Sequence, residues 1–333
     1  MSMRIPFNEG YWNDYLAAQN AQLPAVGAVD DISPLVVRIN GGNPGYMQLQ
    51  GTNTYLIGAG KNRILIDTGE ASRCWISRIV DVLKKRGIEL KYVLLTHWHG
   101  DHTGGVADLL AYDQNLSTNI YKHKPDYFQQ NITHGQVFAV EGATLRAIFT
   151  PGHAVDHMCF HFQEENALFT GDNVLGHGYS VIQDLGTYLN SLRVMQNEQC
   201  SIGYPGHGAR IDDLPAKMKD YIQHKQVRVD QVYGVLARSR SELERIGQAG
   251  KGGMTLNEII KSMYGDVPRD LMEHALVPFL TQALWKLAED LKVGFEPGLS
   301  TQRKWFARPM NVRIAKKVEA VCEAIEMSAV DEL

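Results

Sequence analysis

The stretch Thr96-His97-Trp98-His99-Gly100-Asp101-His102 places three histidines and a carboxylate within seven residues. It follows LKYVLLT (90–96), a short apolar run that is typical of a buried strand. His97 and His99 can both face one metal ion, while Asp101 and His102 turn toward a second position. Imidazole suits zinc, and imidazole with carboxylate also suits manganese or iron. Because the stretch contains no cysteine, it favours a catalytic metal site over a closed structural one.

Further candidate ligands follow later predicted strands or lie in tight glycine turns. ATLRAIFTPGH (143–153) and NALFTGD (166–172) each read as a strand that stops at a glycine-containing loop, and SIGYPGH (201–207) follows. These segments supply His153, Asp172 and His207. Strands that alternate with helices and deliver polar residues from their ends predict a layered α/β fold with one site at the strand ends.

Composition excludes several functional classes. The chain has 333 residues, which favours about two domains, and 33 Lys and Arg against 37 Asp and Glu give a net charge of -4. A nucleic-acid binder usually carries a basic excess, so no nucleic-acid partner is expected. No apolar run is long enough for a membrane span, and the first residues lack the pattern of a secretory signal. With its four cysteines widely scattered, the chain is expected to be cytoplasmic.

The chain divides into three predicted parts: an irregular arm (1–34), a catalytic domain (35–214) and a mainly helical domain (215–333). From residue 215 onward, apolar residues recur at helical spacing, and Thr255 with Glu258 predicts a capping box. KVGFE (292–296) is compatible with a short strand or wing. The basic stretch TQRKWFARPMNVRIAKK (301–317) is interpreted as a solvated helix face.

The blocks ILIDTG (64–69), THWHGDH (96–102), TPGH (150–153), TGD (170–172) and PGH (205–207) occur in the order seen in the metallo-β-lactamase superfamily, which the chain resembles over about residues 35–210. The resemblance implies an αβ/βα sandwich with a binuclear metal site at one edge of two facing sheets. It assigns metal 1 to His97, His99 and His153, metal 2 to Asp101, His102 and His207, and a bridging role to Asp172. It places Asp67 behind the ligands, where it orients the metal loop.

Two other histidines lie near these blocks. His157 either supports the ligands from behind or caps a turn, and His177 either lines the cleft or lies on a solvated loop. Two divalent ions, with zinc expected and manganese as the alternative, lower the pKa of a water molecule and polarise a substrate oxygen. Asp101 is the predicted catalytic residue, because it can orient that water and carry a proton to the leaving group. The predicted reaction is hydrolysis.

INGGNPG (39–45), LQGTNTYLIG (49–58) and GDNVLGHG (171–178) resemble fungal metallo-β-lactamase-type thioesterases of the atrochrysone carboxyl thioesterase group. That group releases aromatic polyketides from the acyl carrier protein of a non-reducing polyketide synthase, and its winged-helix-like tail resembles residues 215–333. The resemblance predicts the same activity here. The alternative is a metal-dependent endoribonuclease of the lactamase-β-2-like branch, which has the same domain layout. Both simple hydrolysis and release coupled to Claisen cyclisation are compatible with this resemblance.

Overall fold

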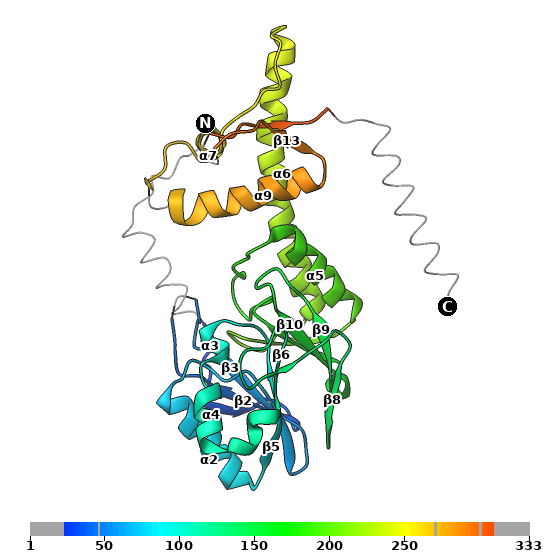
Figure 1. Cartoon of the computed structure of the whole chain (residues 1–333). Helices are drawn as coiled ribbons and strands as arrows, with labels where there is room; N and C mark the ends of the chain where they lie inside the picture. Colours follow the sequence, from blue (N-terminus) through cyan, green and yellow to red (C-terminus); the bar gives the residue numbers. More distant parts are fainter. Residues whose placement is uncertain (1–22, 46, 270–271, 300–301, 310–333) are drawn as a thin grey trace, which may run out of the picture. The chain divides into compact units, whose positions relative to one another are not determined.

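The computed structural model describes residues 23–309 except 46, 270–271 and 300–301 (Figure 1). Two β-sheets form the first part of the chain. The seven-stranded sheet contains, in spatial order, β1 (Val29–Asp31), β2 (Val36–Asn40), β3 (Asn53–Ile57), β4 (Asn62–Ile66), β5 (Glu89–Leu95), β6 (Ile120–Lys122) and β7 (Gln130–Asn131). The five-stranded sheet has the order β12 (Ile202–Pro205), β11 (Ala167–Gly171), β10 (Met158–Phe162), β9 (Ala143–Phe149) and β8 (Val137–Val140).

The two sheets face each other across an apolar core, and helices cover their outer faces (Figure 1). Alternate residues of β3, such as Tyr55 and Ile57, pack between the sheets, whereas Leu56 packs on the opposite face against a helix-lined core. The helices of this part are α2 (Arg73–Arg86), α3 (Gly100–Thr103), α4 (Val106–Tyr112), α5 (Leu185–Asn197) and the start of α6 (Leu214–Arg245), with 3₁₀ turns η1 (Gln114–Thr118) and η2 (Gln163–Glu165). The predicted αβ/βα sandwich is therefore confirmed.

The ends of five strands converge where the candidate ligands lie. Asp67 follows β4 and the metal loop follows β5, and these strands are parallel neighbours. In the second sheet, Asp172 follows β11 and His207 follows its parallel neighbour β12. His153 lies in the connection between β9 and β10. Neighbouring parallel strands end at the same edge of a sheet. This topology therefore brings Asp67 and the candidate ligands, which are spread over residues 67–207, to one site.

The chain divides into two compact units, and the division falls inside α6, between residues 224 and 225. The described part of the second unit contains the rest of α6, then α7 (Leu256–Tyr264), η3 (Met272–Leu276), α9 (Val277–Glu289) and a hairpin of β13 (Val293–Phe295) and β14 (Trp305–Ala307). The capping box is confirmed, since Thr255 and Glu258 bond reciprocally at the start of α7.

Two sequence predictions differ from the structure. Of the predicted arm, residues 1–22 lie outside the described residues, but Val29–Asp31 is not irregular: it forms β1, paired with β2. In the basic stretch, Trp305–Ala307 is a strand and not a helix face, and the Arg303 guanidinium packs over the Trp285 ring at 5.2 Å. Residues 310–317 of that stretch lie outside the described residues. No helix in the described ranges is long and apolar enough to cross a membrane.

A buried ion pair anchors the loop that carries His153. The Lys122 ammonium at the end of β6 donates to Asp156 Oδ2 at 2.9 Å and to the Lys124 carbonyl at 2.6 Å. Both Lys122 and Asp156 are 2 % exposed. Removing only one partner of such a pair strongly destabilises a protein, because the remaining charge is left buried without a partner.

We therefore expect Lys122→Met to lower the free energy of unfolding by about 3–5 kcal/mol. The double variant Lys122→Met/Asp156→Leu should recover most of this loss, because no charge is left unpaired. Lys85→Met is the matched control, since Lys85 is exposed and its pair with Asp81 spans 4.0 Å. Denaturant titration of the metal-free protein measures all three, and a single variant as stable as the double one would contradict the role of the pair.

Candidate metal centre

The carboxylate of Asp67 holds both ends of the metal loop, residues 96–102, through hydrogen bonds. Asp67 Oδ1 accepts a hydrogen bond from the Thr96 backbone N–H at 2.8 Å, and Oδ2 accepts from the Thr96 hydroxyl at 2.9 Å. His102 Nδ1 donates to the same Oδ2 at 2.7 Å. The loop therefore leaves β5 in a fixed direction, and His102 directs its other nitrogen, Nε2, toward the site. Asp67 thus occupies the supporting position that the resemblance implies.

A first group of donors is formed by His97, His99 and His153. His97 Nε2 lies 2.9 Å from His99 Nδ1, and His153 Nε2 lies 3.3 Å from His97 Nε2 and 3.1 Å from His99 Nδ1. His153 Nδ1 donates to the Val181 carbonyl at 2.7 Å, so its Nε2 carries no proton in the neutral ring. His97 Nδ1 lies 2.9 Å from the Thr96 hydroxyl. That hydroxyl donates to Asp67 and accepts from His97, so His97 Nε2 is also unprotonated.

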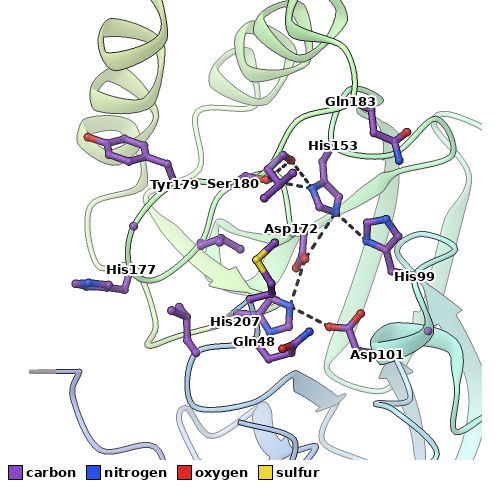
Figure 2. Close-up of a pocket in the computed structure, with 16 residues that line it drawn as sticks. Gln48, His99, Asp101, His153, Asp172, His177, Tyr179, Ser180, Gln183 and His207 are labelled. Atoms are coloured by element: carbon purple, nitrogen blue, oxygen red, sulfur yellow. Dashed lines mark hydrogen bonds and ion pairs between the residues drawn. The ribbon is translucent and has the colours of Figure 1, made fainter. Parts of the chain in front are cut away.

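A second group is formed by Asp101, His102 and His207, of which Figure 2 labels Asp101 and His207. His207 Nε2 lies 3.3 Å from Asp101 Oδ2, and His102 Nε2 lies 3.6 Å from the same oxygen. Asp172 faces both groups: its Oδ2 lies 3.2 Å from His207 Nε2 and 3.7 Å from His153 Nε2. All seven candidate ligands are thus brought together, in the two sets that the resemblance implies.

The donor set fits two metal ions. Two unprotonated nitrogens that face each other repel unless a cation lies between them, and a tetrahedral zinc ion with ordinary bonds separates its ligand atoms by about 3.3 Å. Among the described residues, His102 Nε2 and Asp172 Oδ1 are buried and form no hydrogen bond, and they lie 3.4 Å from each other as an ion pair. Buried polar atoms without partners are rare in proteins. The outer nitrogens of His97, His102 and His153 therefore have fixed partners, and the inner nitrogens of these rings face the centre.

The protonation states of the two groups differ in the metal-free chain. Burial lowers the pKa of His97 well below its usual value, and it also lowers the pKa of His153. Burial disfavours the charged form of His207 too, but the carboxylates of Asp172 and Asp101 outweigh it and raise its pKa to about 9. The pKa of Asp101 is lowered to about 2, because His207 and His102 outweigh its burial. The first group is thus ready for a cation, whereas the second group carries protons.

His157 supports Asp172 from behind. Its Nε2 accepts a hydrogen bond from the Asp172 backbone N–H at 3.1 Å, and its Nδ1 lies 3.0 Å from the Thr150 hydroxyl. The ring is fully buried, and burial lowers its pKa well below the usual value. Of the two interpretations that the sequence leaves open for His157, the contacts favour support of the ligands.

Asn53 and Tyr55 form hydrogen bonds near the site that the sequence analysis did not predict. Asn53 Nδ2 donates to the Gly208 carbonyl at 2.8 Å, and the Tyr55 hydroxyl donates to the Pro205 carbonyl at 2.7 Å. Together they hold the turn that carries His207. The alternation along GTNTYL could indicate that these side chains point inward, but not that their partners lie about 150 residues away.

A cavity of about 550 Å³ opens onto the two groups, which contribute His99, Asp101, His153, Asp172 and His207 to its wall (Figure 2). Its other wall is formed by Leu175, residues 177–181, residues 47–49 and Gln183. His177 belongs to that wall, and the described contacts include no bond from His177 to a ligand residue. The structure thus places His177 at the cleft and not behind the ligands.

The pKa differences predict how the metal-free chain takes up zinc. At pH 7 the first equivalent should bind to unprotonated imidazoles and release few protons, whereas the second should release at least one, because His207 is protonated below a pKa of about 9. Affinity for the second equivalent should rise about tenfold per pH unit for each proton released between pH 7 and 9. Titration calorimetry in buffers of different ionisation enthalpy measures this. Equal proton release in both steps would contradict the assignment.

Comparison with known proteins places this geometry in a family. Residues 48–207 match the family model described as the metallo-beta-lactamase superfamily. The chain is 59% identical over 309 residues to the lactamase-like protein aptB of Emericella nidulans, covering 92% of this chain and 98% of that protein. It is 57% identical to the lactamase-like protein nscB of Aspergillus fumigatus, covering 92% and 94% respectively.

Solved structures show the same fold. A beta-lactamase domain protein from Burkholderia ambifaria superposes with a TM-score of 0.67 at 17% identity, covering 86% of this chain and 95% of that one. A metallo-beta-lactamase family protein from Thermus thermophilus gives a TM-score of 0.56 at 20% identity, covering 83% of this chain and 100% of that one. The chain belongs to the metallo-beta-lactamase superfamily of hydrolases and carries a His/Asp cluster able to bind metal ions.

Proposed function

We propose that the chain is a metal-dependent thioesterase that releases an aromatic polyketide from the acyl carrier protein of a non-reducing polyketide synthase. The proposal starts from the sequence resemblance and from the paired metal groups. The main observation that supports it is the composition of the cavity wall, which is apolar and neutral around the ligand residues. Zinc is the expected metal and manganese the alternative, because histidine and carboxylate ligands accept both.

The cavity is lined by apolar and neutral side chains around the ligand residues. The apolar lining residues are Met47, Leu49, Leu175, Tyr179 and Val181. Among the described residues that line it, none is Lys or Arg. An apolar acyl group gains free energy on entering such a space, roughly 25 cal/mol per Å² of buried surface. A ribonucleic acid gains little, because its flanking phosphates find no cation on these walls.

The chemistry that two divalent ions supply is polarisation of the thioester carbonyl and activation of water at neutral pH. The chain's own residues handle the proton in this reaction. Asp101 is a carboxylate at neutral pH, because His207 and His102 hold its pKa at about 2, so it can accept the proton of the attacking water. The C–O bond forms as the C–S bond breaks, and the proton passes to the departing thiolate. A thiolate is a good leaving group, so Asp101 needs only to pass on the proton it received.

The endoribonuclease alternative requires a surface for the phosphate backbone. The sequence's one locally basic stretch is the obvious source. Within it Arg303 packs over the rings of Trp285, Phe295 and Trp305 at 5.0–5.8 Å, while Lys304 and Arg308 are exposed. That guanidinium is engaged inside the second unit. Together with the cation-free cavity wall, this favours the thioester over the phosphodiester.

Asp101→Ala and Asp172→Ala should each lower thioester turnover by at least about 100-fold, because each removes a carboxylate that faces the metal groups. Circular dichroism should show that both variants remain folded. Asp81→Ala is the control, since Asp81 lies on the exposed face of α2 with its side chain 66% exposed. Near-normal turnover in either site variant would contradict the assigned roles.

A paired assay on one metal-quantified preparation tests the substrate class. We expect metal-dependent thiol release from an aromatic polyketide thioester, presented on a carrier protein or as its pantetheine mimic, and no cleavage of a structured single-stranded RNA. Mass spectrometry of the product separates a free acid from a Claisen-cyclised ring. RNA cleavage without thiol release would move the protein to the endoribonuclease branch.

A further inference from the structure

Gly41, just after β2, and Thr52, just before β3, lie side by side next to the second metal group. The Gly41 N–H donates to the Thr52 carbonyl at 2.7 Å, and the Thr52 N–H donates to Asn43 Oδ1 at 2.9 Å. A backbone N–H can only donate, so the Asn43 atom that faces it must be the carbonyl oxygen. The orientation of the Asn43 amide is thereby fixed, with Nδ2 on its other side.

The fixed amide determines where the Thr52 hydroxyl points. Asn43 Nδ2 donates to Thr52 Oγ1 at 3.1 Å and to Glu70 Oε2 at 3.2 Å. Because Thr52 Oγ1 accepts this bond, its single proton is left to donate elsewhere. Asp101 Oδ2 lies 3.3 Å from Thr52 Oγ1 and, as a carboxylate oxygen, can only accept. The hydrogen bonds thus run in one direction, from Asn43 through Thr52 to Asp101.

Burial makes this chain of bonds effective. Thr52 is 0% exposed, so bulk water does not compete for its hydroxyl. The oxygen that it contacts, Asp101 Oδ2, is the one that lies 3.3 Å from His207 Nε2. Thr52 is also paired with His207 in an isolated β-bridge. The hydroxyl therefore adjoins two members of the second group, and the described contacts give it none with the first group.

We infer that Thr52, oriented by Asn43, is a positioning residue for Asp101 and controls occupancy of the second metal position. Outer partners of this kind usually contribute 10–100-fold to metal affinity. The hydroxyl fixes the rotation of the Asp101 carboxylate and holds Oδ2 toward His207. The inference rests on the two-metal centre of the proposed function but not on the thioester substrate.

Thr52→Val removes the hydroxyl and keeps the shape of the side chain. We expect it to weaken binding of the second Zn²⁺ equivalent by about 10–100-fold and to leave the first equivalent within about twofold of wild type. Thr52→Ser restores the hydroxyl and should return the second affinity to within about threefold of wild type. Competition with a fluorescent zinc chelator gives the affinities, and elemental mass spectrometry after dialysis gives metal ions per chain.

Thr144→Val is the matched control, because it makes the same change in strand β9, away from the ligands. If Thr52→Val does not fold, Asn43→Ala serves instead, since it frees the Thr52 hydroxyl to rotate and should weaken the second equivalent in the same direction by a smaller factor. Unchanged second-metal affinity in the folded variants, or failure of Thr52→Ser to restore it, would overturn the inference.

The wild-type protein separates the two proposals. Fewer than two bound zinc ions would overturn both the binuclear centre and the role of Thr52. Two bound ions without thiol release would contradict the thioesterase proposal alone, because the affinity ratio between Thr52→Val and Thr52→Ser does not depend on the substrate.

Discussion

The metal centre depends on one buried carboxylate, that of Asp67. It is 1% exposed and lies at φ 59, in the left-handed region that a non-glycine residue seldom adopts. Three donors compensate for its burial: the Thr96 N–H, the Thr96 hydroxyl and His102 Nδ1. Through the hydroxyl, Asp67 sets which nitrogen of His97 is unprotonated, and through its bond to Nδ1 it directs His102 Nε2 toward the centre. A single carboxylate thus prepares one ligand in each group, which is why the end of β4 must lie beside the end of β5.

The same arrangement recurs around the rest of the site. The Val181 carbonyl holds the outer nitrogen of His153, and His157 accepts the backbone N–H of Asp172. In each case a neutral or anionic partner satisfies the outer atom and directs the inner one toward the centre. Such a network is stable only if the inner atoms are also satisfied, because unpaired buried donors and acceptors are costly. Two inner atoms, His102 Nε2 and Asp172 Oδ1, form no hydrogen bond among the described residues and lie 3.4 Å from each other, a spacing that suits two ligands of one metal ion.

How much of this could be predicted depends on how local each signal is. The ligands of the metal loop lie within six residues, and Asp172 directly follows a strand, so spacing and periodicity identify them. The helix cap at Thr255 is equally local. The bonds that hold the turn of His207 are different: Tyr55 reaches the carbonyl of Pro205, 150 residues away, and no local pattern encodes that pairing. The basic stretch was misread for a different reason: β14 pairs with β13, which is 10–14 positions earlier and lies in the predicted strand or wing 292–296, but the charges around Trp305–Ala307 obscured the strand.

Chemistry and selectivity come from different parts of the first unit. The paired donor groups suit any ester, thioester, lactam or phosphodiester, since each offers an oxygen to polarise and a bond that water can attack. Discrimination must therefore come from the groups that flank the reacting bond. In the cavity those groups meet the apolar side chains of Met47, Leu49 and Val181, and the described lining residues offer no Lys or Arg. An acyl chain is stabilised by such a wall through burial, whereas each flanking phosphate would lose water without gaining a cation. The wall, and not the metal ligands, thus supports the part of the proposal that concerns a large apolar acyl group.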